Sequence, residues 1–289
     1  MLALDDEDKK FGSYLIPLKN NLKANTFIEK INFIAMQIAI TLIFIAAIIY
    51  SVKFLSGKKK GMVKQLVVAS EKDLAAILFY QKLSSTEKAI FLKEVNIFLQ
   101  KVIITAVNTS ITDADKILVA ASAVIPMFAF KGWQYPHLDE VLLYNDHFNL
   151  GFETEGNEDR NIMGLVGTGV YANKMLLSKP ALVEGFSNNT DKKNTAIHEF
   201  AHLVDGADGD IDGVPEILMD KQYVMPWMNL IHTEMEKMKD KRSDINPYGY
   251  TNKSEFFAVA AEYFFERPDL FKTKHPEMYK AMQDIFNTK

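Results

Sequence analysis

The feature that most constrains the fold of this chain is a five-residue sequence, His198-Glu199-Phe200-Ala201-His202. Two histidines four residues apart can turn both imidazoles toward one atom when the segment is an α-helix, because residues i and i+4 of a helix lie on the same face. In that geometry both rings reach a Zn²⁺ ion at about 2.0–2.1 Å, and Glu199 points at a metal-bound water. The motif therefore predicts a helix whose histidines hold a metal ion.

A chance match is the alternative, because a pattern with three fixed letters also arises in unrelated chains. The surrounding residues favour a metal site. Ile197 and Leu203 are apolar neighbours of the motif, so we expect a buried helix, and buried histidines beside a glutamate need a partner such as a metal ion. Gly206 is the expected C-cap, and Pro215 soon after it limits any continuation of the helix.

The composition restricts which chemistry the chain can use. The 289 residues include no cysteine, which excludes disulfides, thiolate zinc sites and cysteine nucleophiles, so a transition metal has to be held by histidine and carboxylate. The hydrophobic content of 48% is sufficient for a core. A net charge of −4 gives no general attraction to nucleic acid, and we expect no nucleic-acid partner.

An uncharged apolar run extends from Ile31 to Tyr50, with Asn32, Gln37 and Thr41 as its polar residues. A run of about 20 such residues is long enough to cross a bilayer core of about 30 Å. A buried helix of a soluble protein and a signal peptide are the alternatives, but the apolar part of a signal peptide is only about 7–15 residues long. We therefore expect a permanent transmembrane helix.

The flanking lysines predict the orientation of this helix. The lysines after the run are Lys53, Lys58, Lys59, Lys60 and Lys64. Ahead of it the nearest lysines are Lys30, Lys23 and Lys19, with an acidic stretch further out. Lysine-rich flanks stay in the cytoplasm, so we expect a single-pass inner-membrane protein with its C-terminal domain in the cytoplasm; an outward-facing domain is the alternative. The expected division of the chain is a tail (1–26), a transmembrane helix (27–54), a basic juxtamembrane segment (55–69) and a metallopeptidase domain (70–289).

The rest of the chain reads as an α+β domain. Helical periodicity predicts two amphipathic helices within Glu71–Lys101, the second capped by Thr86, and a third apolar helix over Asp113–Phe128. Between Val141 and Val183, short β-like runs separated by Asn, Gly and Pro predict a small sheet. Helices dominate again from Asn194, so the expected fold is mainly helical, with one small sheet ahead of the helix that carries the two histidines.

The third protein ligand of a catalytic zinc should come from a second helix. Asn252 followed by Glu255 is typical of a helix start, and Glu255 and Glu262 are seven positions apart, on one face of that helix. Spacing alone does not choose between these two glutamates. Either carboxylate could instead be solvated or cap the helix.

Three stretches together resemble the Mlc titration factor A (MtfA) family of zinc peptidases, whose core is similar to that of lethal-factor type gluzincins. They are VIPMFAFKGWQYPHLDEVLLYNDHF, HEFAHLVDGADGDIDGVP and EFFAVAAEYFFERPDLF. The resemblance implies a zinc-dependent metallopeptidase that hydrolyses peptide bonds through a zinc-activated water. It further implies that His198, His202 and Glu255 are zinc ligands, that Glu199 is the general base, and that Tyr248 stabilises the oxyanion.

Two departures from the family pattern limit what the resemblance carries over. The apolar run is an addition to a family of soluble cytoplasmic proteins, so the transcriptional repressor bound by the founding member is not transferred to this chain. The founding member also has a histidine near the metal after a GLV sequence. Here Gly164-Leu165-Val166 is followed by Gly167, so we expect no fourth protein ligand at that point. A peptide or protein substrate and a regulatory protein are the expected partners.

Other acidic residues close to the motif admit two interpretations. Asp208, Asp210 and Asp212 resemble a calcium loop, but Met219 stands where such a loop needs its bidentate glutamate, so a tight turn is preferred. Asp205, one turn after His202, is a candidate partner for a ligand imidazole or a plain helix-end residue.

A different class of function also fits these observations. A protein can keep a peptidase scaffold, with little or no catalysis, and act by binding and sequestering a regulatory protein. The presence of Glu199, Tyr248 and Glu255 together favours catalysis, because a binding scaffold has no physical need for a general base.

We expect the full-length protein to fractionate with membranes and to resist alkaline extraction. Its C-terminal domain should be shielded from protease added outside intact cells, and replacing Lys58, Lys59 and Lys60 by neutral residues should weaken that shielding. Digestion of the unmodified domain by external protease would show that it faces outward.

Overall fold

The computed structural model describes residues 67–148, 162–167, 173–188 and 190–287. These belong to one compact unit, Leu66–Lys289. The expected tail, the transmembrane helix at 27–54 and most of the basic segment at 55–69 lie outside the described residues. Within the described ranges, no helix combines the length and the apolar character that a bilayer crossing requires.

A four-stranded sheet with the order β1-β2-β4-β3 confirms the predicted small sheet. The first three strands in this order are parallel, and β3 pairs with β4 in the antiparallel direction at the edge. Strands β2 and β4 are buried except at their first residues, as expected for strands covered on both faces. The strands are β1 (Ile103–Val107), β2 (Glu140–Tyr144), β3 (Gly164–Val166) and β4 (Lys174–Ser178).

The N-terminal helices differ from the prediction in two details. The first predicted helix is two short helices, and the second begins at Ser85 rather than after Thr86. Ser84 is its N-cap, because the Glu87 carboxylate accepts from the Ser84 backbone N–H at 2.9 Å while Ser84 Oγ accepts from the Glu87 N–H at 3.4 Å. The helices are α2 (Glu71–Leu74), α3 (Leu78–Gln81) and α4 (Ser85–Lys101).

The third predicted helix is confirmed as α5 (Asp113–Met127), and it is almost completely buried. Its N-cap, Thr112, forms a reciprocal capping pair with Asp115. Helix α6 (Lys179–Ser187) follows β4 directly and is capped by Ser178. Helix α5 contacts α4, α6 and α7, so it joins the N-terminal helices to the helix of the histidine motif.

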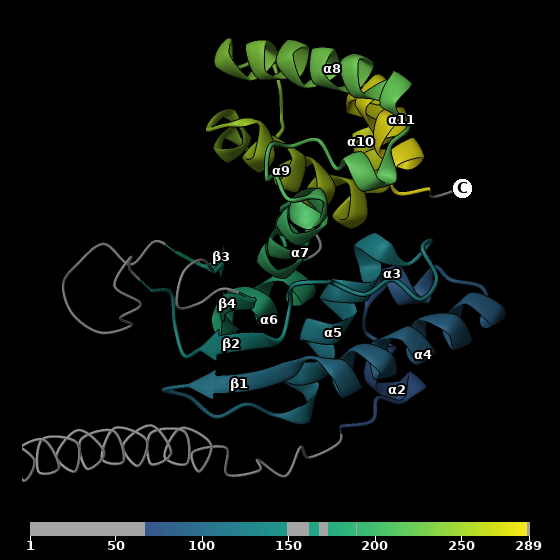
Figure 1. Cartoon of the computed structure of the whole chain (residues 1–289), viewed down its shortest axis with the longest axis vertical. Helices are drawn as coiled ribbons and strands as arrows, with labels where there is room; N and C mark the ends of the chain where they lie inside the picture. The colour runs from purple at the N-terminus through teal and green to yellow at the C-terminus, as the bar shows by residue number, and fades with distance from the viewer. Residues whose placement is uncertain (1–66, 149–161, 168–172, 189, 288–289) are drawn as a thin grey trace, which may run out of the picture. The chain divides into compact units, whose positions relative to one another are not determined.

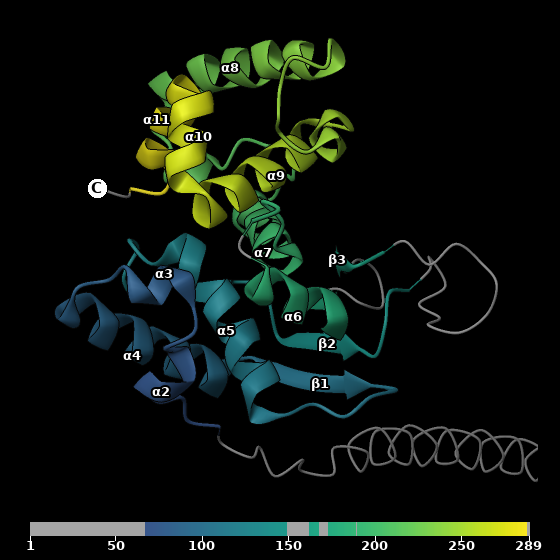
Figure 2. The ribbon, with the colours of Figure 1, turned by 180° about the vertical axis from the view of Figure 1, so that it is seen from behind.

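Helix α7 carries the histidine motif and lies between the two halves of the unit. Figures 1 and 2 show the sheet and α2 to α6 on one side of α7, and α8 to α11 on the other. Helix α9 packs against α7, and every residue from Phe256 to Glu266 is buried. The remaining elements are α7 (Thr195–Asp205), η2 (Gly206–Asp208), η3 (Glu216–Leu218), α8 (Lys221–Lys239), η4 (Pro247–Tyr250), α9 (Lys253–Glu266), α10 (Pro268–Lys274) and α11 (Pro276–Ile285).

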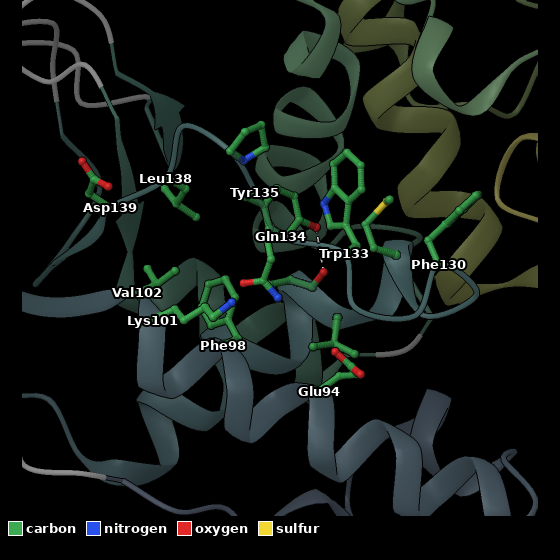
Figure 3. Close-up of a pocket in the computed structure, with 14 residues that line it drawn as sticks. Glu94, Phe98, Lys101, Val102, Phe130, Trp133, Gln134, Tyr135, Leu138 and Asp139 are labelled. Atoms are coloured by element: carbon green, nitrogen blue, oxygen red, sulfur yellow. Dashed lines mark hydrogen bonds between the residues drawn. The ribbon is translucent and has the colours of Figure 1, made fainter.

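Aromatic packing fixes which face of α7 is turned toward the N-terminal helices. Phe200 lies in the motif between the two histidines, and its ring centroid is 5.8 Å from that of Phe98 and 5.1 Å from that of Tyr135. The Tyr135 hydroxyl donates to the Ala123 carbonyl at 2.7 Å. Phe98 and Tyr135 also line a cavity of about 340 Å³ between α4, α5 and the segment after α5 (Figure 3). Because Phe200 is held here, the histidines face the other side of the helix.

A buried histidine joins the C-terminal helices. His275 Nδ1 is 3.0 Å from a Glu234 oxygen, and His275 Nε2 is 2.7 Å from an Asp244 oxygen. The Tyr263 hydroxyl donates to Asp244 at 2.9 Å. Burial disfavours the charged imidazole, but hydrogen bonds and charges of the two carboxylates outweigh it and raise the pKa of His275. Burial also opposes ionisation of Glu234, yet its hydrogen bonds lower the pKa of Glu234 to about 2.

This cluster should make stability depend on pH. The contribution of His275 is complete below its unfolded pKa of about 6.5 and is lost as the pH rises through its raised folded value, while that of Glu234 is lost as the pH falls from about 4.3 toward 2. His275→Gln should therefore lower the free energy of unfolding by about 1–3 kcal/mol near pH 6, and by less in alkaline solution. Urea unfolding of the full chain at several pH values measures this. His232→Gln, at an exposed position on α8, is the control, and a pH-independent difference would contradict the prediction.

Candidate metal centre

The two histidines of α7 are presented by a well-defined helix start. Asn194 is the N-cap, and its side-chain oxygen accepts from the Ile197 backbone N–H at 3.1 Å. The helix ends at Gly206, as predicted. His198 and His202 are both buried on the face toward α9.

Three ligand atoms converge between α7 and α9. His198 Nε2 is 3.1 Å from His202 Nε2 and 3.0 Å from a Glu255 oxygen, and that oxygen is 3.4 Å from His202 Nε2. Ligands bound tetrahedrally at about 2.0–2.1 Å are about 3.3 Å apart, so this triangle has the size that one zinc ion requires. Among the described residues, this is the one group of histidine and acidic side chains with such an arrangement.

The two candidate glutamates of α9 lie on different sides of His198. Glu255, in the first turn, is near the Nε2 atoms and is placed there by Asn252, whose side chain accepts from the Glu255 backbone N–H at 2.9 Å. Glu262 lies 2.6 Å from His198 Nδ1 and also accepts from the Asn194 backbone N–H at 2.7 Å. This geometry makes Glu255 the candidate ligand, and it makes Glu262 the residue that orients the ligand imidazole.

The site favours a positive charge at the point where the ligand atoms meet. Burial disfavours ionisation of His198, but the charge of Glu262 and hydrogen bonds with Glu255 and Glu262 raise the pKa of His198 to about 10. Burial likewise opposes ionisation of Glu255, while hydrogen bonds with His198 and His202 lower the pKa of Glu255 to about 2. Two imidazoles and one carboxylate in this anionic setting fit a divalent cation, and the donor set suits zinc.

Glu199 is buried beside the ligands, against the edge strand. A Cβ atom added to Gly164 of β3 would lie 2.5 Å from both Cγ and Oε1 of Glu199, so only glycine allows the strand to come this close. Burial raises the pKa of Glu199, and the charges of His198 and His202 oppose that rise. This role of Gly164 was not predicted, although a glycine inside a strand is a known signal of close backbone approach.

Tyr248 lies in η4, just ahead of α9, and faces the same site. Its ring centroid is 6.0 Å from that of His198, and its side chain is 55% exposed. Burial and the charges of Glu255 and Glu199 raise the pKa of Tyr248, so its hydroxyl keeps its proton at neutral pH. The structure thus brings Tyr248 together with the four other residues named for the site from the sequence.

Asp205 joins the end of α7 to the following turn. It is fully buried, and one of its oxygens accepts from the Gly213 backbone N–H at 2.8 Å. Trp227 Nε1 donates to the Gly213 carbonyl at 2.8 Å. Gly213 has φ of +84°, and a Cβ there would lie 2.4 Å from the Lys253 carbonyl at the start of α9. Within the described residues, the other Asp205 oxygen and His202 Nδ1 have no hydrogen-bond partner. Of the two roles left open for Asp205, the hydrogen bond to Gly213 agrees with the helix-end role.

The nearby aspartates cap their own turn. Asp208 accepts from the backbone N–H groups of Asp210 and Glu216, and Asp212 accepts from that of Val214. These bonds agree with the tight turn preferred from the sequence.

Comparison with known proteins identifies relatives over most of the described unit. Residues 58–287 match the sequence model of a family described as glucose-regulated metallo-peptidase M90. An uncharacterized protein of Synechocystis sp. is 27% identical over 218 residues, which are 72% of this chain and 79% of that protein. The Mlc titration factor A of Pectobacterium atrosepticum is 27% identical over 203 residues, 65% of this chain and 73% of that protein. That of Escherichia coli is 37% identical over 101 residues, 32% and 37% of the two chains. The family resemblance noted in the sequence is confirmed.

Because Glu255 and Glu262 lie on different sides of His198, replacing each of them should weaken zinc binding to a different extent. Glu255→Ala removes a candidate ligand and should weaken zinc binding by far more than 100-fold, whereas Glu262→Ala removes the partner of a ligand imidazole and should weaken it by about 10–100-fold. Chelator competition on the full chain measures both dissociation constants. Glu277→Ala, at an exposed position on α11, is the control. The reverse ranking would overturn the choice of ligand.

Proposed function

As the chain belongs to the glucose-regulated M90 metallopeptidase family, we propose that it is a zinc-dependent peptidase with Glu199 as its general base. The observation that carries this proposal is the convergence of His198, His202 and Glu255 on one point beside the buried Glu199. His198, His202 and Glu255 would hold the ion. When bound, zinc supplies acidification of a water molecule and polarisation of the substrate carbonyl.

Glu199 moves the proton in this reaction. Its carboxylate accepts a proton from the attacking water and delivers it to the nitrogen of the departing amine. Burial raises its pKa above that of an exposed glutamate. A group that first accepts and then donates a proton works best when its pKa is close to the pH of the solution, so this rise suits the proposed role. Gly164 serves this role by leaving space for the carboxylate.

Tyr248 donates a hydrogen bond to the carbonyl oxygen as negative charge develops on it. Its half-exposed position on η4 keeps the hydroxyl at the open side of the site, where a peptide enters. A donor of this kind acts mainly in the transition state, so it contributes to turnover more than to binding of the substrate.

The substrate class that fits this chemistry is a peptide or protein. A scaffold that sequesters a regulatory protein is the second candidate function, and the name Mlc titration factor A of several relatives supports it. The general base and the oxyanion donor in place beside the ligand cluster favour catalysis.

We also propose that the peptidase domain is attached to the inner membrane by the apolar run from Ile31 to Tyr50 and faces the cytoplasm. The absence of charge in the run and the lysines after it support this location.

Two substitutions separate catalysis from metal binding. Glu199→Gln should keep zinc and lower kcat by at least about 10²–10⁴-fold, because an amide cannot accept the proton of the attacking water. Tyr248→Phe should keep zinc and lower kcat by about 10²–10³-fold with little change in KM. Zinc content and the cleavage of a peptide mixture by the full chain are the measurements.

Tyr250→Phe is the matched control, because this tyrosine is also exposed on η4. It should retain the wild-type kcat. If the wild type cleaves no peptide or protein, and Glu199→Gln complements a deletion strain fully, the proposal of a peptidase is wrong and the protein acts as a binding scaffold.

A further inference from the structure

A cavity of about 370 Å³ opens directly beside the candidate metal ligand His202. It lies between the second half of α7, the end of β3 and the turn that follows α7. Its walls are largely aliphatic and aromatic, and they include Tyr135, Val166, Leu203, Ala207 and Ile211. A cavity that touches both a metal ligand and the edge strand next to the general base is a place for part of a substrate.

Ile211 forms the outer wall of this cavity. The residue is 52% exposed, so it is accessible to a substrate. It packs against the end of α7, because a Cβ added to Gly206 would lie 2.8 Å from Ile211 Cγ1. The glycine at the helix end therefore allows an apolar side chain to stand at the mouth of the cavity.

Among the described residues, the lining of the cavity offers no unpaired charge to a substrate side chain. The charged lysine among its lining residues, Lys174, pairs with Glu140 across β2 and β4. The remaining polar side chains in the lining are His137, Asn173 and His202. Moving a charged side chain into such surroundings costs free energy, whereas an apolar one gains about 25 cal/mol for each Å² buried.

We propose that this cavity receives an apolar side chain of the substrate adjacent to the cleaved bond, with Ile211 as a specificity-determining residue. The inference rests on the proposed peptidase function and names its substrate class: peptides with Leu, Ile, Met or Phe next to the scissile bond. The cavity is lined by His202, so a substrate side chain held there would lie next to the candidate metal ligands.

The test uses the zinc-loaded full chain and a mixture of peptides whose cleavage sites are read by mass spectrometry. The wild type should prefer apolar residues at one position beside the cut. Ile211→Asp should lower kcat/KM for these peptides by about 10–200-fold, mainly through KM, and shift the preference toward Lys and Arg. Ile211→Trp should narrow the cavity and shift the preference toward Ala and Gly.

Ile217→Asp is the matched control, because Ile217 is an exposed isoleucine on η3 outside the cavity lining. It should keep the wild-type preference. Zinc content and thermal unfolding check that each variant is folded, and Ile211→Trp keeps the test available if the aspartate variant unfolds.

Binding without cleavage separates this inference from the proposed function. Fluorescence anisotropy of labelled peptides, measured with Glu199→Gln in the presence and absence of Ile211→Asp, should show the same change of preference. A wild type that cleaves peptides without an apolar preference, or a preference that neither Ile211 variant alters, overturns the inference. If no peptide is cleaved but the preference in peptide binding still depends on Ile211, the result overturns the peptidase function and leaves the inference about the cavity standing.

Discussion

The hydrogen bond between His198 and Glu262, at 2.6 Å across the α7–α9 interface, is the contact on which the site depends. Both side chains are buried, and a buried carboxylate requires partners that compensate for its lost hydration. Glu262 obtains them from the imidazole and from the backbone N–H of Asn194, the N-cap of α7. The Glu262 carboxylate thus fixes the start of α7, the orientation of the His198 ring and the position of α9 against α7.

The charges around this contact couple the fold to the metal. Glu199, Glu255 and Glu262 surround two imidazoles in a largely buried space, and without a metal ion their negative charge is offset chiefly by the proton on His198, whose pKa they raise to about 10. A cation bound there joins helices that are far apart in the chain and should stabilise the folded state by an amount that rises with the logarithm of its concentration divided by its Kd. The negative charge that favours metal binding therefore destabilises the folded protein when no metal is bound.

The sequence predicted those helices and helix ends that depend on residues close together in the chain. Periodicity and caps identified α5, the start of α9 at Asn252 and the end of α7 at Gly206. The start of α4 was placed too late, because Ser84 and Thr86 both fit a capping pattern and only Ser84 makes the bonds. Strand β1 was not predicted, since its five residues are partly exposed and are defined by pairing with β2.

The residues of the site were named from the sequence, but their relations depend on tertiary packing. Spacing left Glu255 and Glu262 equivalent, and the crossing of α7 and α9 separates them by placing one at Nε2 and the other at Nδ1 of the same imidazole. A glycine inside a strand signals a close approach, but it does not identify the neighbour, and only the packing of β3 against α7 shows that the neighbour of Gly164 is Glu199.

The turn after α7 has a consequence for how such a chain can diverge. Surface turns usually accept insertions and deletions. Here Asp205 holds Gly213, and Gly213 rests on the first residue of α9, Lys253, close to Glu255. The turn acts as a spacer between the histidine helix and the glutamate helix, so a change in its length would move Glu255 away from His198 and His202. The number of residues between Gly206 and Gly213 is therefore constrained by the position of α9.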